Sequence, residues 1–150
     1  MSDSAAVLVQ LHELFATQAL AVLSTDGDGC PYASLVAFAS SDDLRQLFFA
    51  TARDTRKFAN LQSNCQVALL VDNRSNNVRD FAHAIAATAL GSCRELTGPE
   101  RDEASHRFLE KHPSLAEFVS APNCALIQVT VRSINLVSRF RNVTEYHFTA

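Results

Sequence analysis

The chain has 150 residues, a formal net charge of −3 and a hydrophobic fraction of 47%. This length is typical of one domain, which buries roughly two-thirds of the surface exposed by the unfolded chain, so the core needs no disulfide or metal ion. The small net charge does not favour nucleic acid or a membrane surface as a main partner.

The apolar runs are at most about eight residues long, whereas a membrane-spanning helix needs about twenty. The first residues also lack the basic start of a secretory signal. We therefore expect a single cytoplasmic domain over residues 1–150, with no membrane or nucleic-acid partner.

The first predicted element is an amphipathic helix at residues 4–17. Apolar residues recur there at steps of three and four, the pattern of a helix that buries one face. They are Val7, Leu8, Leu11, Leu14 and Phe15. Ser4 carries a hydroxyl group that suits an N-cap.

Three strands that form an antiparallel meander are predicted next. Residues 19–25 and 31–40 lie on either side of a turn in which Gly27 and Gly29 supply the positive φ of a tight hairpin. A polar turn then leads into a third strand at residues 45–51.

A short helix is expected at residues 54–64. Asp54 or Thr55 would cap it, and Phe58 and Leu61 would face inward. A buried strand follows at 65–71. The polar stretch 72–80 is predicted to be a loop. Residues 81–92 are predicted as a strand, although their alanines would also suit a helix.

The C-terminal third predicts two helices and two closing strands. Thr97 and Glu100 form a capping box for a helix to about Lys111, and Ser114 and Glu117 form another for a short helix. The strands are expected at 125–131 and 134–140. Six or seven mostly sequential strands with outer helices indicate a small barrel of the α+β class, mainly antiparallel.

The cysteines and histidines give no sign of a metal site. Cys30, Cys65, Cys93 and Cys124 lie about thirty residues apart without a Cys-x-x-Cys pair, so we expect buried, reduced thiols. The histidines are equally dispersed and provide no pair four residues apart on a helix.

The segment from Thr51 to Lys57 carries the clearest chemistry. An apolar strand ends in Thr51, and a hydroxyl, a guanidinium and an ammonium follow at a helix start on Thr55, Arg56 and Lys57. Free backbone N–H groups and the positive end of the helix dipole favour an anion there, and arginine binds phosphate with two parallel hydrogen bonds. The alternative is that Arg56 and Lys57 form only a solvated helix face.

Two linked stretches resemble the FMN-binding split-barrel family that includes pyridoxamine 5′-phosphate oxidase. The first is the run from Phe48 to Lys57 followed by Asn60-Leu61-x-x-Asn64-x-x-Val67-x-Leu69, and the second, upstream, is Gly29-x-Pro31-Tyr32-Ala33-Ser34-Leu35-Val36. The similarity covers most of residues 19–71 and extends more loosely to the later strands.

The resemblance implies a six-stranded split barrel with peripheral helices, which dimerises and binds one FMN in each of two clefts at the subunit interface. It implies that Thr51, Thr55, Arg56 and Lys57 hold the phosphate. It also implies that the backbone of Ser34, Leu35 and Val36 meets the isoalloxazine edge and that Ala50 passes the flavin. The family places residues of the second subunit over the ring, and His83 falls in the corresponding stretch; the alternative is a histidine at a strand start or a subunit contact.

Some departures from the family bear on the substrate. The chain is shorter than a genuine pyridoxamine 5′-phosphate oxidase and lacks its tryptophan and its C-terminal Arg-x-His motif. Ser34 also replaces a basic residue of the true oxidases. We therefore do not expect oxidation of pyridoxamine 5′-phosphate. Arg139 and Arg141 lie where larger members grip substrate phosphate, or they are surface charges or dimer contacts.

Two functions follow as hypotheses. The first is an FMN-dependent oxidoreductase in a homodimer, in which the flavin carries hydride or electrons while the catalytic residues, substrate and electron donor stay unassigned. The second is a non-catalytic flavin- or haem-binding module. It is suggested by the lack of an evident general base and by a likeness of residues 106–113 and 137–140 to a haem-utilisation branch of the superfamily.

Overall fold

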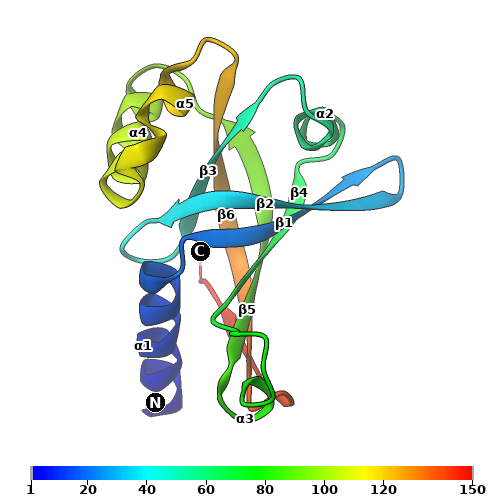
Figure 1. Ribbon diagram of the computed structural model, residues 1–150, viewed down its shortest axis with the longest axis vertical. Coiled ribbons are helices and arrows are strands. Elements are labelled where there is room, and N and C mark those ends of the chain that lie inside the picture. Colours follow the sequence, from blue (N-terminus) through cyan, green and yellow to red (C-terminus); the bar gives the residue numbers. More distant parts are fainter. Residues whose placement is uncertain (1, 150) are drawn as a thin grey trace.

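Seven antiparallel strands form one sheet in the computed structural model, which describes residues 2–149 (Figure 1). The strand order is β3-β2-β1-β4-β5-β6-β7, and β3 also pairs with β6. This pairing closes the first six strands into a barrel and leaves β7 as an additional strand. The strands are β1 Leu20–Gly27, β2 Cys30–Ser40, β3 Gln46–Ala52, β4 Gln66–Asp72, β5 Ile85–Glu95, β6 Cys124–Ser138 and β7 Asn142–His147.

Five α-helices lie outside the barrel. They are α1 Ser2–Thr17, α2 Arg56–Ser63, α3 Asp80–His83, α4 Gly98–Lys111 and α5 Ala116–Ser120, with a 3₁₀ turn at Pro113–Leu115. Helices α2, α4 and α5 lie around one end of the barrel, whereas α3 lies at the other end (Figure 1). None of the helices in the described range 2–149 is both long enough and apolar enough to cross a membrane.

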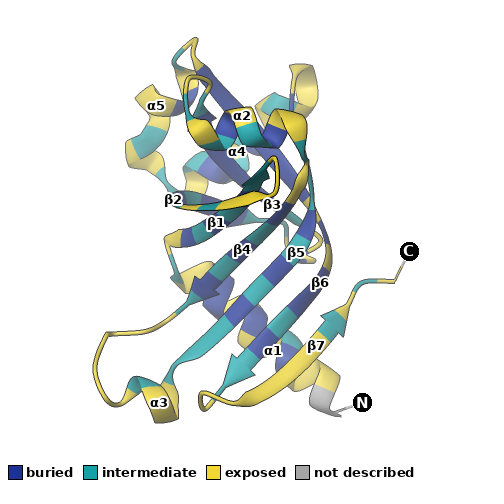
Figure 2. Ribbon diagram, turned by 90° about the vertical axis from the view of Figure 1, so that its right-hand side faces the viewer, coloured by how far each residue is buried: buried dark blue, intermediate teal, exposed yellow. Residues whose placement is uncertain are grey.

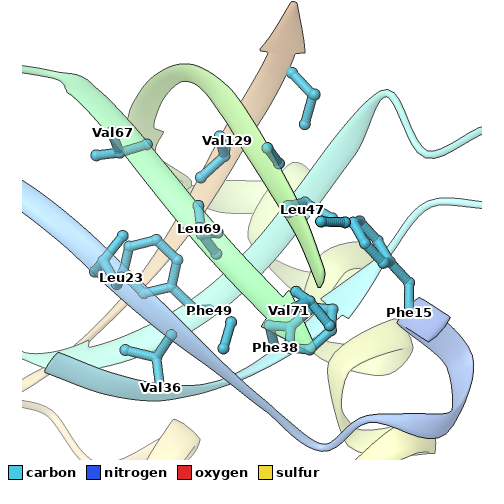
Figure 3. Packing of buried hydrophobic residues seen from close by; sticks show 14 of the residues in the cluster. Phe15, Leu23, Val36, Phe38, Leu47, Phe49, Val67, Leu69, Val71 and Val129 are labelled. Carbon is cyan, nitrogen blue, oxygen red and sulfur yellow. The ribbon is translucent and has the colours of Figure 1, made fainter. Parts of the chain in front are cut away.

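The apolar core has two layers. Alternate residues of the strands point into the barrel, where Leu23, Val36, Phe49, Leu69 and Val129 pack together under α1 (Figures 2 and 3). A second layer fills the space between the outer face of β3 and β6 and the helices α4 and α5. It contains Ala39, Phe48, Ala50, Leu96, Ala104, Phe108, Val119, Cys124 and Leu126.

The predicted barrel, the meander and the short helix expected at residues 54–64 are confirmed. Strand β2 pairs with both β1 and β3 in antiparallel register. Helix α2 begins at Arg56 with Thr55 as its N-cap, and it buries Phe58 and Leu61 as expected.

The N-terminal cap and the hairpin turn differ in detail from the predictions. Helix α1 begins at Ser2, so Ser4 lies inside it. In the hairpin, positive φ occurs at Asp28 and Gly29, whereas Gly27 stays in β1 opposite Cys30. The aspartate takes the left-handed position because its short polar side chain tolerates it.

The predicted strand 81–92 was wrong at its start. Phe81 and His83 belong to the short helix α3, and β5 begins only at Ile85. The carboxylate of Asp80 accepts hydrogen bonds from the backbone N–H groups of Ser75 and Asn76, which orders the preceding loop and starts the helical turn.

The two predicted closing strands are one continuous strand, β6, and the final strand β7 was not predicted. A β-bulge in the β5–β6 pairing, where Leu90 lies opposite Ser133 and Gly91 opposite Val131, accommodates Arg132 without ending the strand. The true turn lies at Arg139 and Phe140, which both adopt positive φ.

Both predicted capping boxes are absent. Thr97 precedes α4 without a side-chain cap, and the Glu100 carboxylate accepts hydrogen bonds from Arg94. Ser114 lies inside the 3₁₀ turn.

The prediction of four buried thiols was also wrong. Only Cys124 is buried, Cys93 is partly buried, and Cys30 and Cys65 are exposed.

Candidate functional site

The end of strand β3 and the start of helix α2 bring two hydroxyl groups together. The Oγ1 atoms of Thr51 and Thr55 lie 3.2 Å apart, and Thr51 is buried. The Thr55 hydroxyl donates to the carbonyl of Ala52 at 2.8 Å and accepts from the N–H of Phe58 at 3.3 Å. Thr55 therefore fixes the start of α2, as an N-cap does.

Two cationic side chains follow on the first turn of α2. Across residues 2–149, neither Arg56 nor Lys57 takes part in an ion pair, and their backbone N–H groups have no backbone acceptor. The guanidinium of Arg56 lies over the ring of Tyr32, with 5.1 Å between its Cζ atom and the ring centroid. In contrast, Arg53 is neutralised by Glu95 at 2.7 Å. This helix start thus keeps two uncompensated positive charges.

A cleft of about 330 Å³ opens beside these residues. Its walls come from β2, β3, α2, α4, the 3₁₀ turn and α5, which are far apart in sequence. The lining residues are Leu35, Val36, Ala37, Ala50, Thr51, Ala52, Thr55, Lys57, Phe108, Leu115 and Phe118. One end of the cleft is polar and cationic, and the rest is apolar. Several lining side chains are small alanines, which leave room for a flat ligand with an anionic group.

Strand β2 presents alternate side chains to the cleft and to the barrel. Leu35 points outward and is 64% exposed, whereas Val36 is buried in the barrel core. Ser34 has the same orientation as Val36, and its Oγ is the one fully buried side-chain oxygen or nitrogen without a hydrogen-bond partner in the described chain. The Ser34 hydroxyl therefore does not face the cleft, so only its backbone could meet a ligand there.

The structure thus gathers six predicted site residues around one cleft: Leu35, Val36, Ala50, Thr51, Thr55 and Lys57. Arg56 lies next to it on the exposed side of α2. The aromatic walls Phe108 and Phe118 were missed. The sequence indicated their helices, but nothing local says where a helix packs.

Three further predicted residues lie elsewhere. His83 is on α3, at the opposite end of the barrel from α2 (Figure 1). Arg139 and Arg141 are exposed in and beside the β6–β7 turn. A single chain therefore does not bring these three residues to the cleft.

The cleft offers little acid–base chemistry. Lys57 is the one charged side chain among its lining residues, which include no histidine, cysteine, aspartate or glutamate. Residues 2–149 also contain no group of three metal-binding side chains.

A family model described as pyridoxamine 5′-phosphate oxidase matches residues 9–138. A search of curated proteins found no match.

Three solved structures share the fold. The chain is similar to a heme binding protein from Mycobacterium smegmatis, with a TM-score of 0.80 and 15% identity over 89% of this chain and 55% of that one. The chain is also similar to General Stress Protein 26 from Bacillus anthracis, with a TM-score of 0.72 and 17% identity over 95% of this chain and 98% of that one. Its similarity to a FAD-binding protein from Mesorhizobium loti has a TM-score of 0.66 and 20% identity over 85% of this chain and 91% of that one. The chain spans about half the length of the M. smegmatis protein.

Proposed function

The chain belongs to the pyridoxamine 5′-phosphate oxidase family, and we propose that it binds FMN in the cleft of Lys57 and Phe118 and uses it as an oxidoreductase. The observation that supports this most is the polarity of the cleft. Lys57 lines one end of the cleft, Arg56 and two backbone N–H groups without backbone acceptors lie next to it, and the lining away from Lys57 and the two threonines is apolar. FMN has the matching distribution, with a phosphate at one end and a flat ring at the other.

The residues present fit this cofactor. Arg56 and Lys57, the amides at the start of α2 and the Thr51 hydroxyl would hold the phosphate. The backbone of Ser34, Leu35 and Val36 would serve the polar edge of the ring, and Ala50 leaves room for its face. The FMN would supply hydride or electron transfer, while the chain positions it and excludes water with Phe108 and Phe118.

We also propose that the protein acts as a homodimer. The outer face of the sheet carries an apolar band that runs from β2 across β1 and β4 to β5 and β6. Its members are Leu20, Val22, Ala33, Leu35, Ala68, Leu70, Ala86, Thr88, Leu90 and Val137. An apolar sheet face of this extent indicates an interaction surface.

The symmetry of such a dimer would complete the cleft. In a two-fold interface the same patch of both protomers packs together. Ends of the patch on opposite sides of the axis therefore meet, one from each protomer. One end is Leu35, at the cleft. The other end leads to Phe81 and Phe140, which are 58% and 70% exposed and stack edge to face at 5.0 Å. The two-fold axis would bring Phe81 and Phe140 to the cleft of the second protomer, together with His83, which lies on the same short helix as Phe81.

A second candidate is a module that binds flavin or haem without turnover. It is favoured by the similarity to the M. smegmatis heme binding protein and by the lack of an acid–base group in the cleft. The lining residues of one protomer provide no histidine, cysteine, methionine or tyrosine to ligate haem iron. A haem ligand would therefore have to come from the partner, with His83 as a candidate.

Absorbance spectroscopy of the purified protein tests these proposals. The oxidoreductase should copurify with, or take up, FMN and give a flavin spectrum that NADH or NADPH bleaches under anaerobic conditions. A flavin-loaded protein that neither nicotinamide reduces would favour the non-catalytic module. A protein that binds no FMN when the cofactor is added would refute the FMN proposal.

A further inference from the structure

Two cysteines face each other across strands β4 and β5. Gln66 lies opposite Ser92 in the antiparallel register, so the next pair along is Cys65 and Cys93. The backbone N–H of Cys93 donates to the carbonyl of Cys65 at 2.9 Å, which continues the ladder beyond the end of β4. Directly opposed residues of an antiparallel ladder have Cα atoms about 4.5–5.5 Å apart, within the range of about 4.4–6.8 Å that a disulfide requires.

The two side chains lie on the same face of the sheet. Residues directly opposite each other in an antiparallel pair project to the same side. Cys93 packs against the apolar core at the end of the barrel, and Cys65 is exposed beside it. Burial raises the pKa of the Cys93 thiol to about 11, and the neighbouring Cys65 contributes to this increase. The two sulfur atoms are thus close enough to influence one another electrostatically.

Their unequal exposure assigns them different roles. Cys65 is reachable by a small oxidant from solvent, whereas Cys93 is partly covered and stays protonated at neutral pH because of its raised pKa. An exposed thiol beside a second, protected thiol is the arrangement of a peroxide-sensitive pair with an attacking and a resolving cysteine.

We propose that Cys65 and Cys93 are a redox modification site and form a reversible intramolecular disulfide when the protein meets hydrogen peroxide. The Cys65 thiol first loses its proton to solvent, and the thiolate attacks one peroxide oxygen, which breaks the O–O bond and gives a sulfenic acid. The other oxygen leaves as hydroxide and takes up that proton to become water. The Cys93 sulfur then attacks the Cys65 sulfur. The S–O bond breaks, and the sulfenic oxygen leaves as a second water with the Cys93 proton. The two thiols lose two electrons and the peroxide gains them.

The disulfide would bear on the part of the fold that holds the cleft. Cys65 follows helix α2 by two residues, so a link to β5 ties the C-terminal end of that helix to the barrel. It would also close a loop of about 29 residues that contains α3, which restricts the unfolded chain and raises Tm by about 10 °C. This inference does not depend on the proposed FMN function.

Peptide mass mapping without reduction tests the proposal. The wild-type protein is treated with hydrogen peroxide and alkylated under denaturing conditions, alongside Cys65→Ser and Cys93→Ser. Cys30→Ser is the matched control, because Cys30 is also exposed but lies on the β1–β2 hairpin. Circular dichroism confirms that each variant is folded.

We expect wild type and Cys30→Ser to give linked peptides of Cys65 and Cys93, with the loss of two hydrogen atoms and full reversal by dithiothreitol. Neither Cys65→Ser nor Cys93→Ser should give this product. The proposal is overturned if both thiols of the peroxide-treated wild type remain open to alkylation. It is also overturned if the link joins two chains, or if Cys65 oxidises to the sulfinic acid while Cys93 stays free.

Discussion

Replacement of Arg56 and Lys57 together by alanine should strongly reduce the preference of the protein for FMN over riboflavin, which differ only in the phosphate. Both side chains lie on the first turn of α2 without an ion-pair partner in the described chain, so their charge is available to a ligand. The apolar walls of the cleft, including Phe108 and Phe118, are untouched by this change. Riboflavin binding should therefore stay as it is.

The magnitude follows from the interactions that are lost. A hydrogen bond to a charged group contributes about 1.5–3 kcal/mol, but Arg56 is exposed and Lys57 half-buried, so solvent weakens both. A combined loss of about 3 kcal/mol weakens FMN binding roughly a hundredfold. The two backbone N–H groups and the threonine hydroxyls would still contribute the rest of the free energy of phosphate binding. The free energy of unfolding should fall by only about 1 kcal/mol, mainly from the contact of Arg56 with Tyr32.

Fluorescence titration with FMN and with riboflavin measures both affinities, and urea unfolding measures stability. Arg45→Ala/Arg132→Ala is the matched control, because it removes the same charge from two exposed residues away from the cleft. A double variant with an unchanged ratio of FMN to riboflavin affinity would refute the phosphate site. An equal loss in the control would show that only overall charge is responsible.

Three other predictions test the fold and its surfaces. Gly91→Ala should lower the free energy of unfolding by about 2 kcal/mol or more in urea, because a Cβ at Gly91 would meet the backbone carbonyl of Thr130. Burial lowers the pKa of Lys111 from 10.5 to about 8. The unfolded chain therefore binds more protons than the folded chain between these pH values, and stability should rise with pH there relative to Lys111→Met. Leu70→Glu, at the centre of the outer apolar band, should give monomers by light scattering; unchanged dimers would contradict the proposed interface.

Local sequence signals predicted the start of α2 well, because its chemistry is local. The Thr55 hydroxyl reaches an amide only three residues away, and Phe58 and Leu61 are spaced to bury one face of a short helix. The hairpin of β1 and β2 was predictable for the same reason, since its turn residues enforce it. Elements stabilised by neighbours along the chain are therefore the ones that periodicity finds.

The end of the fold was less predictable because tertiary pairing determines it. Arg132 and Ser133 indicated a break, yet the bulge at Gly91 lets β6 run through them. Strand β7 has almost no buried residues, so it lacks the alternation of a half-buried strand. The opposition of Cys65 and Cys93 was hidden too, because it depends on a register that the wrong start of β5 obscured.

In the candidate site, too, the residues determined by local chemistry were predicted and those placed by tertiary packing were not. Hydroxyl and cationic residues at a helix start suggested an anion site from Thr51 to Lys57, and the family resemblance specified FMN. Alternation in β2 explains why Ser34 and Leu35 differ, since one points into the barrel and the other into the cleft. The walls formed by Phe108 and Phe118 depend on where α4 and α5 pack, which no local pattern encodes.

Two neighbouring residues of α5 allow effects on stability to be distinguished from effects on ligand binding in the cleft. Val119 is 4% exposed and belongs to the layer between α5 and the barrel, whereas Phe118 is 41% exposed and lines the cleft. Val119→Ala should therefore lower the free energy of unfolding by about 2 kcal/mol through a lost buried contact. Phe118→Ala should lower the free energy of unfolding by only about 1 kcal/mol, because the side chain is partly exposed.

Flavin affinity should show the opposite order. Phe118→Ala removes an aromatic wall from the proposed ring site, and loss of such a contact costs about 1 kcal/mol, or roughly fivefold in Kd. Val119→Ala should leave Kd unchanged under conditions where the protein stays folded. Titration and urea unfolding of both variants measure the two effects on the same samples. If Phe118→Ala binds FMN as wild type does, the ring does not lie against α5 and the proposed orientation of the cofactor is wrong.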